Sequence, residues 1–164
     1  ITEHLRPTPT PHAGYKEMKP FVFAGFYPIA QTDYENLKKA IDKLHLEDAL
    51  ILRTAFIPNS EVRNYFCAAD VVVQPYRNAT QSGVTPLAYH FEKPMIVTRV
   101  GGLPEIVEHG KTGYVVEVNP GAVAEAILDF FVHNREKAFG EGVKAAKFRF
   151  SWAYMVQAIV SLSD

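Results

Sequence analysis

The residue types best suited to chemistry gather in one polar turn, Asn78-Ala79-Thr80-Gln81-Ser82-Gly83, between an apolar run and a helix-length run. Backbone N–H groups at the start of a helix, together with the positive end of the helix dipole, attract anions. Thr80 and Ser82 would add hydroxyl donors, and Gly83 would admit a phosphate without a Cβ in the way. The turn predicts a phosphate site, although a plain helix cap that binds nothing has the same composition.

Four further positions admit two interpretations each. Glu105 is either catalytic or, as we favour, a first-turn acid that stabilises a helix dipole. The pair Gly101-Gly102 is interpreted as a tight turn rather than a second phosphate loop. Arg99 follows an apolar run and is equally compatible with a phosphate contact and with a solvated loop. His90 is interpreted as a helix-packing side chain rather than a base.

Composition and charge exclude several classes of protein. The 164 residues carry a formal net charge of −1, which gives no overall attraction to nucleic acid or to anionic lipid. No apolar run approaches the roughly 20 residues that a membrane span needs, and the polar, proline-rich start is unlike a signal peptide. We therefore expect a cytoplasmic protein without a nucleic-acid partner.

The single cysteine, Cys67, excludes an internal disulfide and a zinc site built from several thiolates. Its apolar surroundings favour a buried structural thiol over a nucleophile. The histidines are scattered without the spacing of metal ligands, so no metal is expected.

Short β-branched apolar runs alternate with helical patterns along the chain, which predicts a parallel sheet buried on both faces. We expect an α/β fold: a doubly wound, Rossmann-like sandwich with a mainly parallel sheet of about five or six strands and helices on both faces. Residues 1–20 should be irregular, and 21–164 should form a single domain. The predicted strands are 21–25, 50–52, 71–73, 95–98 and 114–116. The predicted helices cover 32–45, a short segment from 59 or 60, 84–91, a segment from Pro120, 135–147 and 151–162.

Helix starts are predicted from capping residues. Thr32 and Glu35 have the spacing of a capping box, and either Asn59 or Ser60 should cap the next helix. Ser151 should cap the last one. In parallel sheets of this kind, ligands bind at the carboxyl ends of the strands, which is where the polar turn falls.

The order of these segments resembles the C-terminal nucleotide-sugar-binding domain of GT-B-fold retaining glycosyltransferases of group 1. The resemblance covers about residues 21–132, and the final helix after Phe150 looks like the last helix of that family. Its most specific parts are Gly-Gly-Leu-Pro-Glu-Ile-Val at 101–107 and His-Gly-Lys-Thr-Gly-Tyr-Val-Val at 109–116.

The resemblance implies a hexosyltransferase-type enzyme that uses a UDP- or GDP-sugar donor without a metal or other cofactor. It places the donor's diphosphate on the loop before the helix and the nucleobase near the segment 56–58. Tyr76 and Arg77 would line the same mouth. The implied donor-binding residues are Thr80, Gln81, Ser82, Gly83, Val84, Ile57 and Pro58.

Two departures from the family pattern stand out. The family carries two glutamates that contact sugar and ribose, and alignment on Lys93-Pro94 places Ala79 and Leu87 at those positions. The arginine and lysine that neutralise the leaving diphosphate should follow the first strand of the domain. Nothing at or before residues 25–28 has their pattern.

A chain of this length holds only one of the two domains of a GT-B enzyme. We therefore expect a donor-binding half that is inactive alone and needs an N-terminal acceptor domain, with peripheral membrane association possible for the full enzyme. Two alternatives remain open. One is a non-catalytic module for assembly or regulation, and the other is half of a sugar-nucleotide 2-epimerase.

Overall fold

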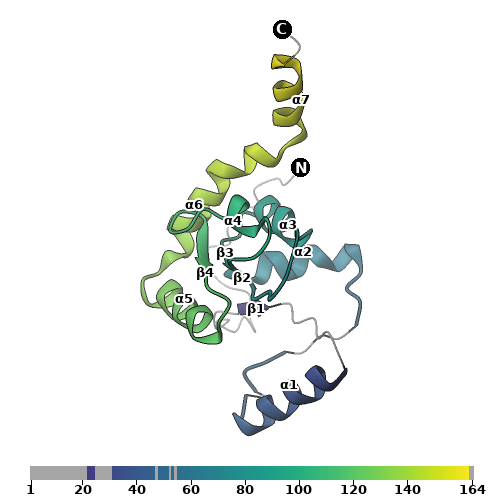
Figure 1. The fold of residues 1–164 in the computed structure, drawn as a ribbon, viewed down its shortest axis with the longest axis vertical. Coiled ribbons are helices and arrows are strands. Elements are labelled where there is room, and N and C mark those ends of the chain that lie inside the picture. Colours follow the sequence, from purple (N-terminus) through teal and green to yellow (C-terminus); the bar gives the residue numbers. More distant parts are fainter. Residues whose placement is uncertain (1–21, 25–30, 47, 52, 54, 163–164) are drawn as a thin grey trace, which may run out of the picture.

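The computed structural model describes residues 22–24, 31–46, 48–51, 53 and 55–162, with side chains from residue 35 onward (Figure 1). They contain a parallel four-stranded sheet in the order β1-β2-β3-β4. The predicted strands 21–25, 71–73, 95–98 and 114–116 are confirmed. The observed bounds are β1 (Val22–Ala24), β2 (Val71–Gln74), β3 (Met95–Thr98) and β4 (Gly113–Val116).

The central strands β2 and β3 are buried at every position, as their continuous apolar sequence predicts. In the register, Val72 pairs with Met95, and Met95 pairs with Gly113. A Cβ on Gly113 would lie 1.8 Å from the Met95 carbonyl oxygen, so only glycine allows β4 to begin here.

The predicted helices are found in the described residues, with ends that differ by at most two residues. Two short elements are added to them: the one-turn helix α4 and a 3₁₀ turn, η1, which joins the last two helices. The bounds are α1 (Gln31–Lys43), α2 (Asn59–Ala68), α3 (Val84–His90), α4 (Leu103–Ile106), α5 (Pro120–Val132), α6 (Arg135–Ala146), η1 (Lys147–Phe150) and α7 (Trp152–Ser161).

Apolar side chains cover the sheet on both faces, which confirms the α/β sandwich. On one face Val72, Met95 and Val97 pack with α3, α4 and the end of α6. On the other face Val71, Val73 and Ile96 pack with α5 and the start of α6. Full burial of one large aliphatic or aromatic side chain stabilises the folded state by about 1.5–3 kcal/mol. The two layers therefore hold the carboxyl ends of the strands in fixed positions.

One predicted strand is wrong. Leu50 and Ile51 lie outside any strand, and Ile51 is 71% exposed, while Leu52 lies outside the described residues. A run of three apolar residues does not by itself establish a strand. A strand also needs a neighbouring strand to pair with, and the sequence does not identify one for this run. The described sheet therefore has four strands rather than five or six.

Cys67 is exposed, which corrects the predicted buried thiol. The half-buried side of α2 carries Val62, Tyr65 and Phe66, as the sequence predicts, and the Phe66 ring stacks on Phe91 at 5.3 Å. Cys67 follows Phe66 directly and is turned about 100° away from it around the helix, toward solvent.

The capping predictions have mixed outcomes. Ser151 caps α7, because its Oγ accepts a hydrogen bond from Tyr154 N at 3.1 Å. Neither Asn59 nor Ser60 caps α2, since Pro58 occupies the cap position and makes no side-chain hydrogen bond. The fixed φ of proline suits a helix entry, so no polar cap is needed for α2 to begin there. The Thr32 side chain and the predicted irregular segment 1–20 lie outside the described residues.

Two helices lie away from the sheet, α1 at one end of the molecule and α7 at the other (Figure 1). In α7 the apolar side chains of Trp152, Ile159 and Val160 are 79%, 56% and 58% exposed. Within the described part of the chain, no helix combines the length and the apolarity needed to cross a membrane.

Candidate donor-binding site

The polar turn lies at the carboxyl edge of the sheet, where the sequence predicts it. It follows β2 and packs against the Gly101-Gly102 turn that follows β3. Gly102 N donates a hydrogen bond to Thr80 O at 2.8 Å. Gly101 has φ of +50°, and a Cβ there would lie 1.9 Å from Ala79 O. The glycine pair thus forms a turn that holds the polar loop at this edge.

An open hollow of about 460 Å³ lies between the two turns and is lined by Asn78, Ala79, Thr80, Val100 and Gly101. Asn78 and Thr80 are exposed. The hollow therefore gives a small polar ligand access to the loop from solvent.

The backbone N–H groups of Thr80, Gln81, Ser82 and Gly83 make no hydrogen bond to any residue that the structure describes. They precede α3, whose own first N–H group, that of Val84, donates to Ser82 Oγ at 3.2 Å. Consecutive unpaired N–H groups before a helix form a concave set of donors suited to phosphate oxygens.

A buried network of polar side chains holds Ser82 in position. Gln74 Nε2 donates to Ser82 Oγ at 2.8 Å, and Thr85 Oγ1 donates to Gln74 Oε1 at 3.1 Å. Gln74 is 3% exposed and Thr85 is fully buried. The Ser82 oxygen is thus already used, and the residue positions the loop more than it offers a free hydroxyl.

Sequence reasoning missed Gln74 and Thr85 as parts of the site. The available signal was the presence of polar side chains in apolar elements, one at the end of a buried strand and one in the first turn of a short helix. Buried polar groups need partners, so two such groups flanking a polar turn indicate a bonded network.

Gly83 has an ordinary helical conformation, with φ of −66° and ψ of −18°. A Cβ built on Gly83 would meet no atom within 4 Å. The fold itself therefore does not require glycine here, and the position is open on its outer side.

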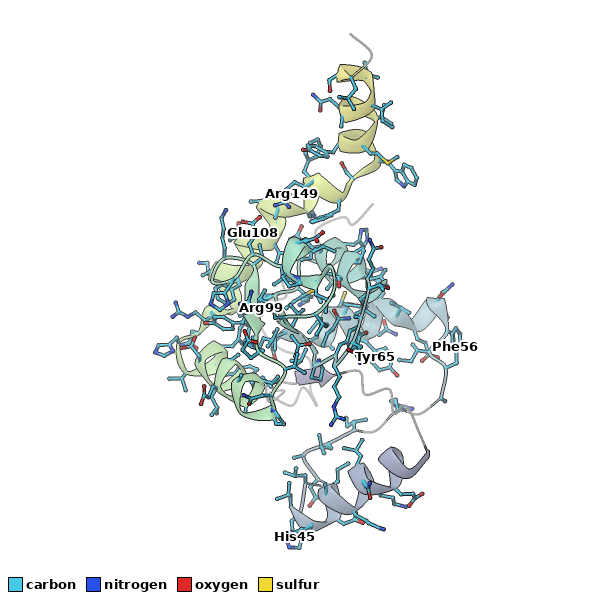
Figure 2. All side chains as sticks on the ribbon, in the orientation of Figure 1. His45, Phe56, Tyr65, Arg99, Glu108 and Arg149 are labelled. Atoms are coloured by element: carbon cyan, nitrogen blue, oxygen red, sulfur yellow. The ribbon has the colours of Figure 1, made fainter. Side chains whose placement is uncertain are left out.

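The other predicted donor-binding residues have less support from contacts. Ile57 is half-buried and Pro58 exposed, and Pro58 O accepts the first hydrogen bond of α2 from Glu61 N at 2.8 Å. Among the described residues, no hydrogen bond joins this segment to the polar turn. The neighbouring Phe56 side chain is 88% exposed (Figure 2). A nucleobase contact at Ile57 and Pro58 stays a prediction.

Arg99 lies at the same edge of the sheet (Figure 2). Its Nε forms an ion pair with Glu117 Oε1 at 2.9 Å. Both side chains are more than half exposed. His90 is also exposed, and its ring contacts the adjacent Phe91 ring at 4.9 Å. Within the described residues no group of three or more histidine, cysteine, aspartate or glutamate side chains could hold a metal ion.

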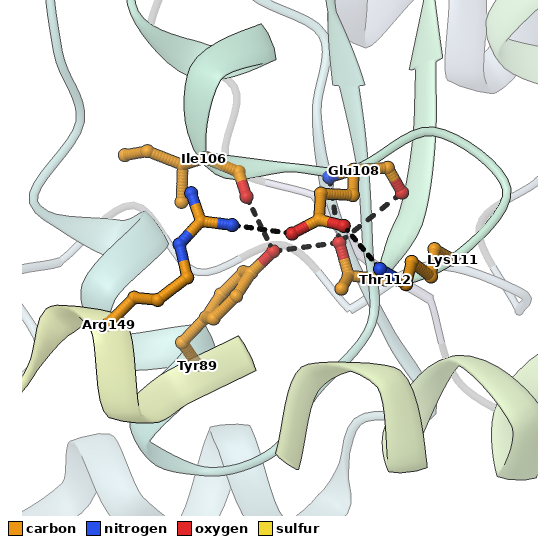
Figure 3. Close-up of polar contacts among 6 residues, drawn as sticks. All are labelled: Tyr89, Ile106, Glu108, Lys111, Thr112 and Arg149. Carbon is orange, nitrogen blue, oxygen red and sulfur yellow. Dashed lines mark hydrogen bonds and ion pairs between the residues drawn. The ribbon is translucent and has the colours of Figure 1, made fainter. Parts of the chain in front are cut away.

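The loop 108–112 is tied to the rest of the domain by a polar cluster (Figure 3). The Tyr89 hydroxyl lies 2.8 Å from both Ile106 O and Thr112 Oγ1. Glu108 N donates to Thr112 Oγ1 at 2.9 Å, and the Glu108 carboxylate pairs with Lys111 and Arg149. These contacts join α3, α4, the loop before β4 and η1, so the family motif at 109–116 is structural here.

Burial and pairing shift the pKa of two groups in this cluster. Burial raises the pKa of the Tyr89 hydroxyl above its usual value, so it remains a neutral donor. The Lys111 hydrogen bond, followed by the charges of Lys111 and Arg149, lowers the pKa of Glu108. Glu108 is therefore ionised at neutral pH and holds both cations.

Solved structures of similar fold were found at low sequence identity. Sucrose-phosphate synthase from Thermosynechococcus elongatus is 20% identical, with a TM-score of 0.70, and the match covers 87% of this chain and 37% of that one. Anabaena HepE in complex with UDP is 22% identical, with a TM-score of 0.68 and coverage of 86% and 39%. The C-terminal domain of a group 1 glycosyl transferase, LpcC from Francisella tularensis, is 18% identical with a TM-score of 0.64, and the match covers 77% of this chain and 66% of that one. These likenesses show the fold.

A shorter stretch is similar to elongation factor 4. The protein from Oleidesulfovibrio alaskensis is 51% identical over 49 residues, or 30% of this chain and 8% of that protein. The one from Phocaeicola vulgatus is 47% identical over 62 residues, or 38% and 10%. The chain therefore spans about a tenth or less of these proteins, and the similarity carries no activity over to it.

A model of the family described as glycosyl transferases group 1 matches residues 12–132, which is well over half of the chain. The match contains the parallel sheet, the polar turn and both glycine-containing motifs. The chain belongs to the group 1 glycosyl transferase family.

Proposed function

We propose that this chain is the donor-binding half of a retaining glycosyltransferase and that its polar turn binds the diphosphate of a UDP- or GDP-sugar. The observation that carries the proposal is the set of unpaired N–H groups at residues 80–83, beside an open hollow at the carboxyl edge of the sheet. The family membership and the UDP bound by HepE support the choice of ligand.

In this proposal the four N–H groups and the exposed Thr80 hydroxyl donate to diphosphate oxygens. When the anomeric C–O bond breaks, negative charge grows on the departing diphosphate, and fixed donors stabilise that charge without reorganising. Ser82 and Val84 position the turn through their mutual hydrogen bond. Because these hydrogen-bond donors are mainly backbone N–H groups, the proposed phosphate binding needs no metal.

The acceptor would be held by an N-terminal domain. Matches to the first two solved structures cover 37% and 39% of those chains, so this chain corresponds to a part of them. The exposed apolar side chains of α7 support a partner for that helix, because contiguous apolar surface of this kind marks an interaction site. The proposed domain is 21–164.

Two substitutions test the phosphate site. Gly83→Val places a side chain over the unpaired N–H groups, and Ser82→Asp places a carboxylate there. Each is expected to abolish UDP or GDP binding in calorimetric titration while leaving the circular dichroism spectrum and melting temperature near those of the wild type. Gly140→Val in α6 and Ser60→Asp in the first turn of α2 are the matched controls, and both should bind normally. Unchanged affinity in both site variants would refute the site.

The alternative function is a non-catalytic module that binds no donor. The residues at the two positions of the family glutamates favour this alternative, because neither carries a carboxylate. Ala79 is half-buried, and the apolar Leu87 side chain is 40% exposed. A thermal-shift panel of nucleoside diphosphates separates the two functions. A donor-binding domain gains stability as ligand concentration rises, whereas the module does not.

A further inference from the structure

From the geometry beside the polar turn, we infer that the Glu105 carboxylate binds hydroxyl groups of the donor. It would thereby replace the two family glutamates, whose positions are Ala79 and Leu87 in this chain. The inference rests on the proposed donor-binding function. It assigns a substrate-contacting role to a side chain that sequence reasoning interpreted as a first-turn acid.

The Glu105 carboxylate lies beside the polar turn. A Cβ built on Gly102 would be 3.3 Å from Thr80 O, 3.8 Å from Gln81 Cγ and 3.9 Å from Glu105 Oε2. The Gln81 Cγ methylene and the Glu105 Oε2 oxygen thus both lie within 4 Å of this one position. Both side chains are exposed, so their amide and carboxylate groups are open to hydrogen bonds with sugar or ribose hydroxyl groups.

The Glu105 carboxylate is unpaired among the described residues. It is three residues after the helix cap Gly102, the position from which a glutamate reaches back to the cap N–H in a capping box. The Glu105 side chain does not accept that hydrogen bond here, because Gly102 N already donates to Thr80 O at 2.8 Å. Glu105 is exposed, and although its backbone N donates to Gly102 O at 3.2 Å, its side chain makes no hydrogen bond or ion pair with another described residue.

The backbone that carries Glu105 is held firmly. Leu103 is fully buried, and the carbonyl of Ile106 accepts the Tyr89 hydroxyl at 2.8 Å (Figure 3). The side chain therefore starts from a fixed point beside the Gly102 backbone, as precise recognition of hydroxyl groups requires.

Charge decides which part of the donor Glu105 contacts. A carboxylate repels the diphosphate. Glu105 is therefore suited to the neutral, hydrogen-donating groups of the donor that lie on either side of the diphosphate. A carboxylate can accept two hydroxyl hydrogens at once, as acidic residues in dinucleotide-binding domains do with ribose. The ligand chemistry is a pair of adjacent hydroxyl groups, from either the ribose or the transferred sugar.

The test is calorimetric titration of the whole chain and of Glu105→Ala and Glu105→Gln with four probes: pyrophosphate, UDP, 2′,3′-dideoxy-UDP and UDP-glucose. Glu125→Ala, an exposed glutamate on α5, is the matched control. Loss of hydrogen bonds to a charged group should weaken UDP-glucose binding by about 10- to 100-fold, with a smaller loss for Gln. Pyrophosphate affinity and melting temperature should not change.

The probes also identify the hydroxyl pair. If ribose is bound, UDP affinity falls in Glu105→Ala while dideoxy-UDP affinity is unaffected; if the sugar is bound, only UDP-glucose affinity falls. Equal affinity of variant and wild type for UDP-glucose, or an equal loss for pyrophosphate, overturns the role of Glu105 alone. If the wild type binds neither pyrophosphate nor UDP, nor GDP in a further titration, the proposed function fails and this inference fails with it.

Discussion

At the scale of single residues, glycines at the carboxyl edge have opposite roles. Gly101 is required by the fold, because its backbone is left-handed and Ala79 O occupies the space of a Cβ. Gly83 is not required by the fold, because its conformation is helical and the space around it is empty. Only the structure distinguishes the two, since a sequence shows the residue type but not the atom opposite it.

A matched pair of alanine substitutions tests this contrast. Gly101→Ala should lower the free energy of unfolding by about 2–3 kcal/mol, because it combines backbone strain with a steric clash. Gly83→Ala should leave the free energy of unfolding unchanged or raise it by up to about 1 kcal/mol, since it restricts the unfolded chain. Urea denaturation of both variants measures the difference. Equal stability of the two would show that the polar turn is not held by close contact with Gly101.

At the scale of elements, the polar cluster around Glu108 joins segments that are distant in the sequence. Arg149 of η1 pairs with Glu108 at 2.6 Å, and the Phe150 ring packs edge-on against Tyr89 at 5.2 Å. The cluster thereby ties the end of the chain to α3 and to the loop before β4. The short elements α3 and α4 depend on such contacts, because a helix of one or two turns is not stable alone.

The lowered pKa of Glu108 gives a pH dependence. Because the folded pKa lies below the unfolded value, near 4.5, the contribution of Glu108 is present above that value and is lost as pH falls through the lower, folded pKa. Removing this carboxylate should therefore flatten the fall in stability on the acidic side. Melting temperatures of Glu108→Gln and wild type between neutral pH and about pH 3 measure the effect. Glu125→Gln, whose native side chain makes no ion pair with a described residue, should follow the wild type, and an equally steep profile for Glu108→Gln would contradict the assignment.

At the scale of the whole molecule, the described chain is a sandwich with an open carboxyl edge and two helices away from the sheet (Figure 1). Its apolar helix α7 is exposed, and its matches cover only part of the larger glycosyltransferases. A donor site at the open edge needs a second surface to hold an acceptor and to exclude water.

The chain alone should therefore bind the donor without turning it over. We expect a calorimetric signal with UDP and no release of UDP from UDP-glucose in a coupled assay. Binding energy from one half of the cleft positions the donor but does not bring an acceptor to the anomeric carbon. Release of UDP by the isolated chain at rates typical of glycosyl transfer would contradict the proposed division between two domains.

The sequence alone determined the fold class, the four strands of the described sheet to within one residue and the position of the polar turn. Local patterns carry this information, because buried parallel strands are continuously apolar and helices repeat with their own period. The same patterns failed at Leu50 and Ile51, which lie outside the strands of the described residues, and at Cys67, whose orientation follows from which side of α2 packs.

Tertiary structure alone decided how the site is assembled. The hydrogen bond from Gly102 to Thr80, the hydrogen bond from the buried Gln74 to Ser82 and the approach of Gln81 to Gly102 join residues that are 8 to 22 positions apart. No local pattern encodes such contacts, because they arise when the carboxyl ends of parallel strands are brought to the same edge. Sequence thus placed the polar turn before a helix, and only the tertiary structure showed that its N–H groups make no hydrogen bond to a described residue and that the Glu105 side chain lies near Gly102, which is bonded to the turn.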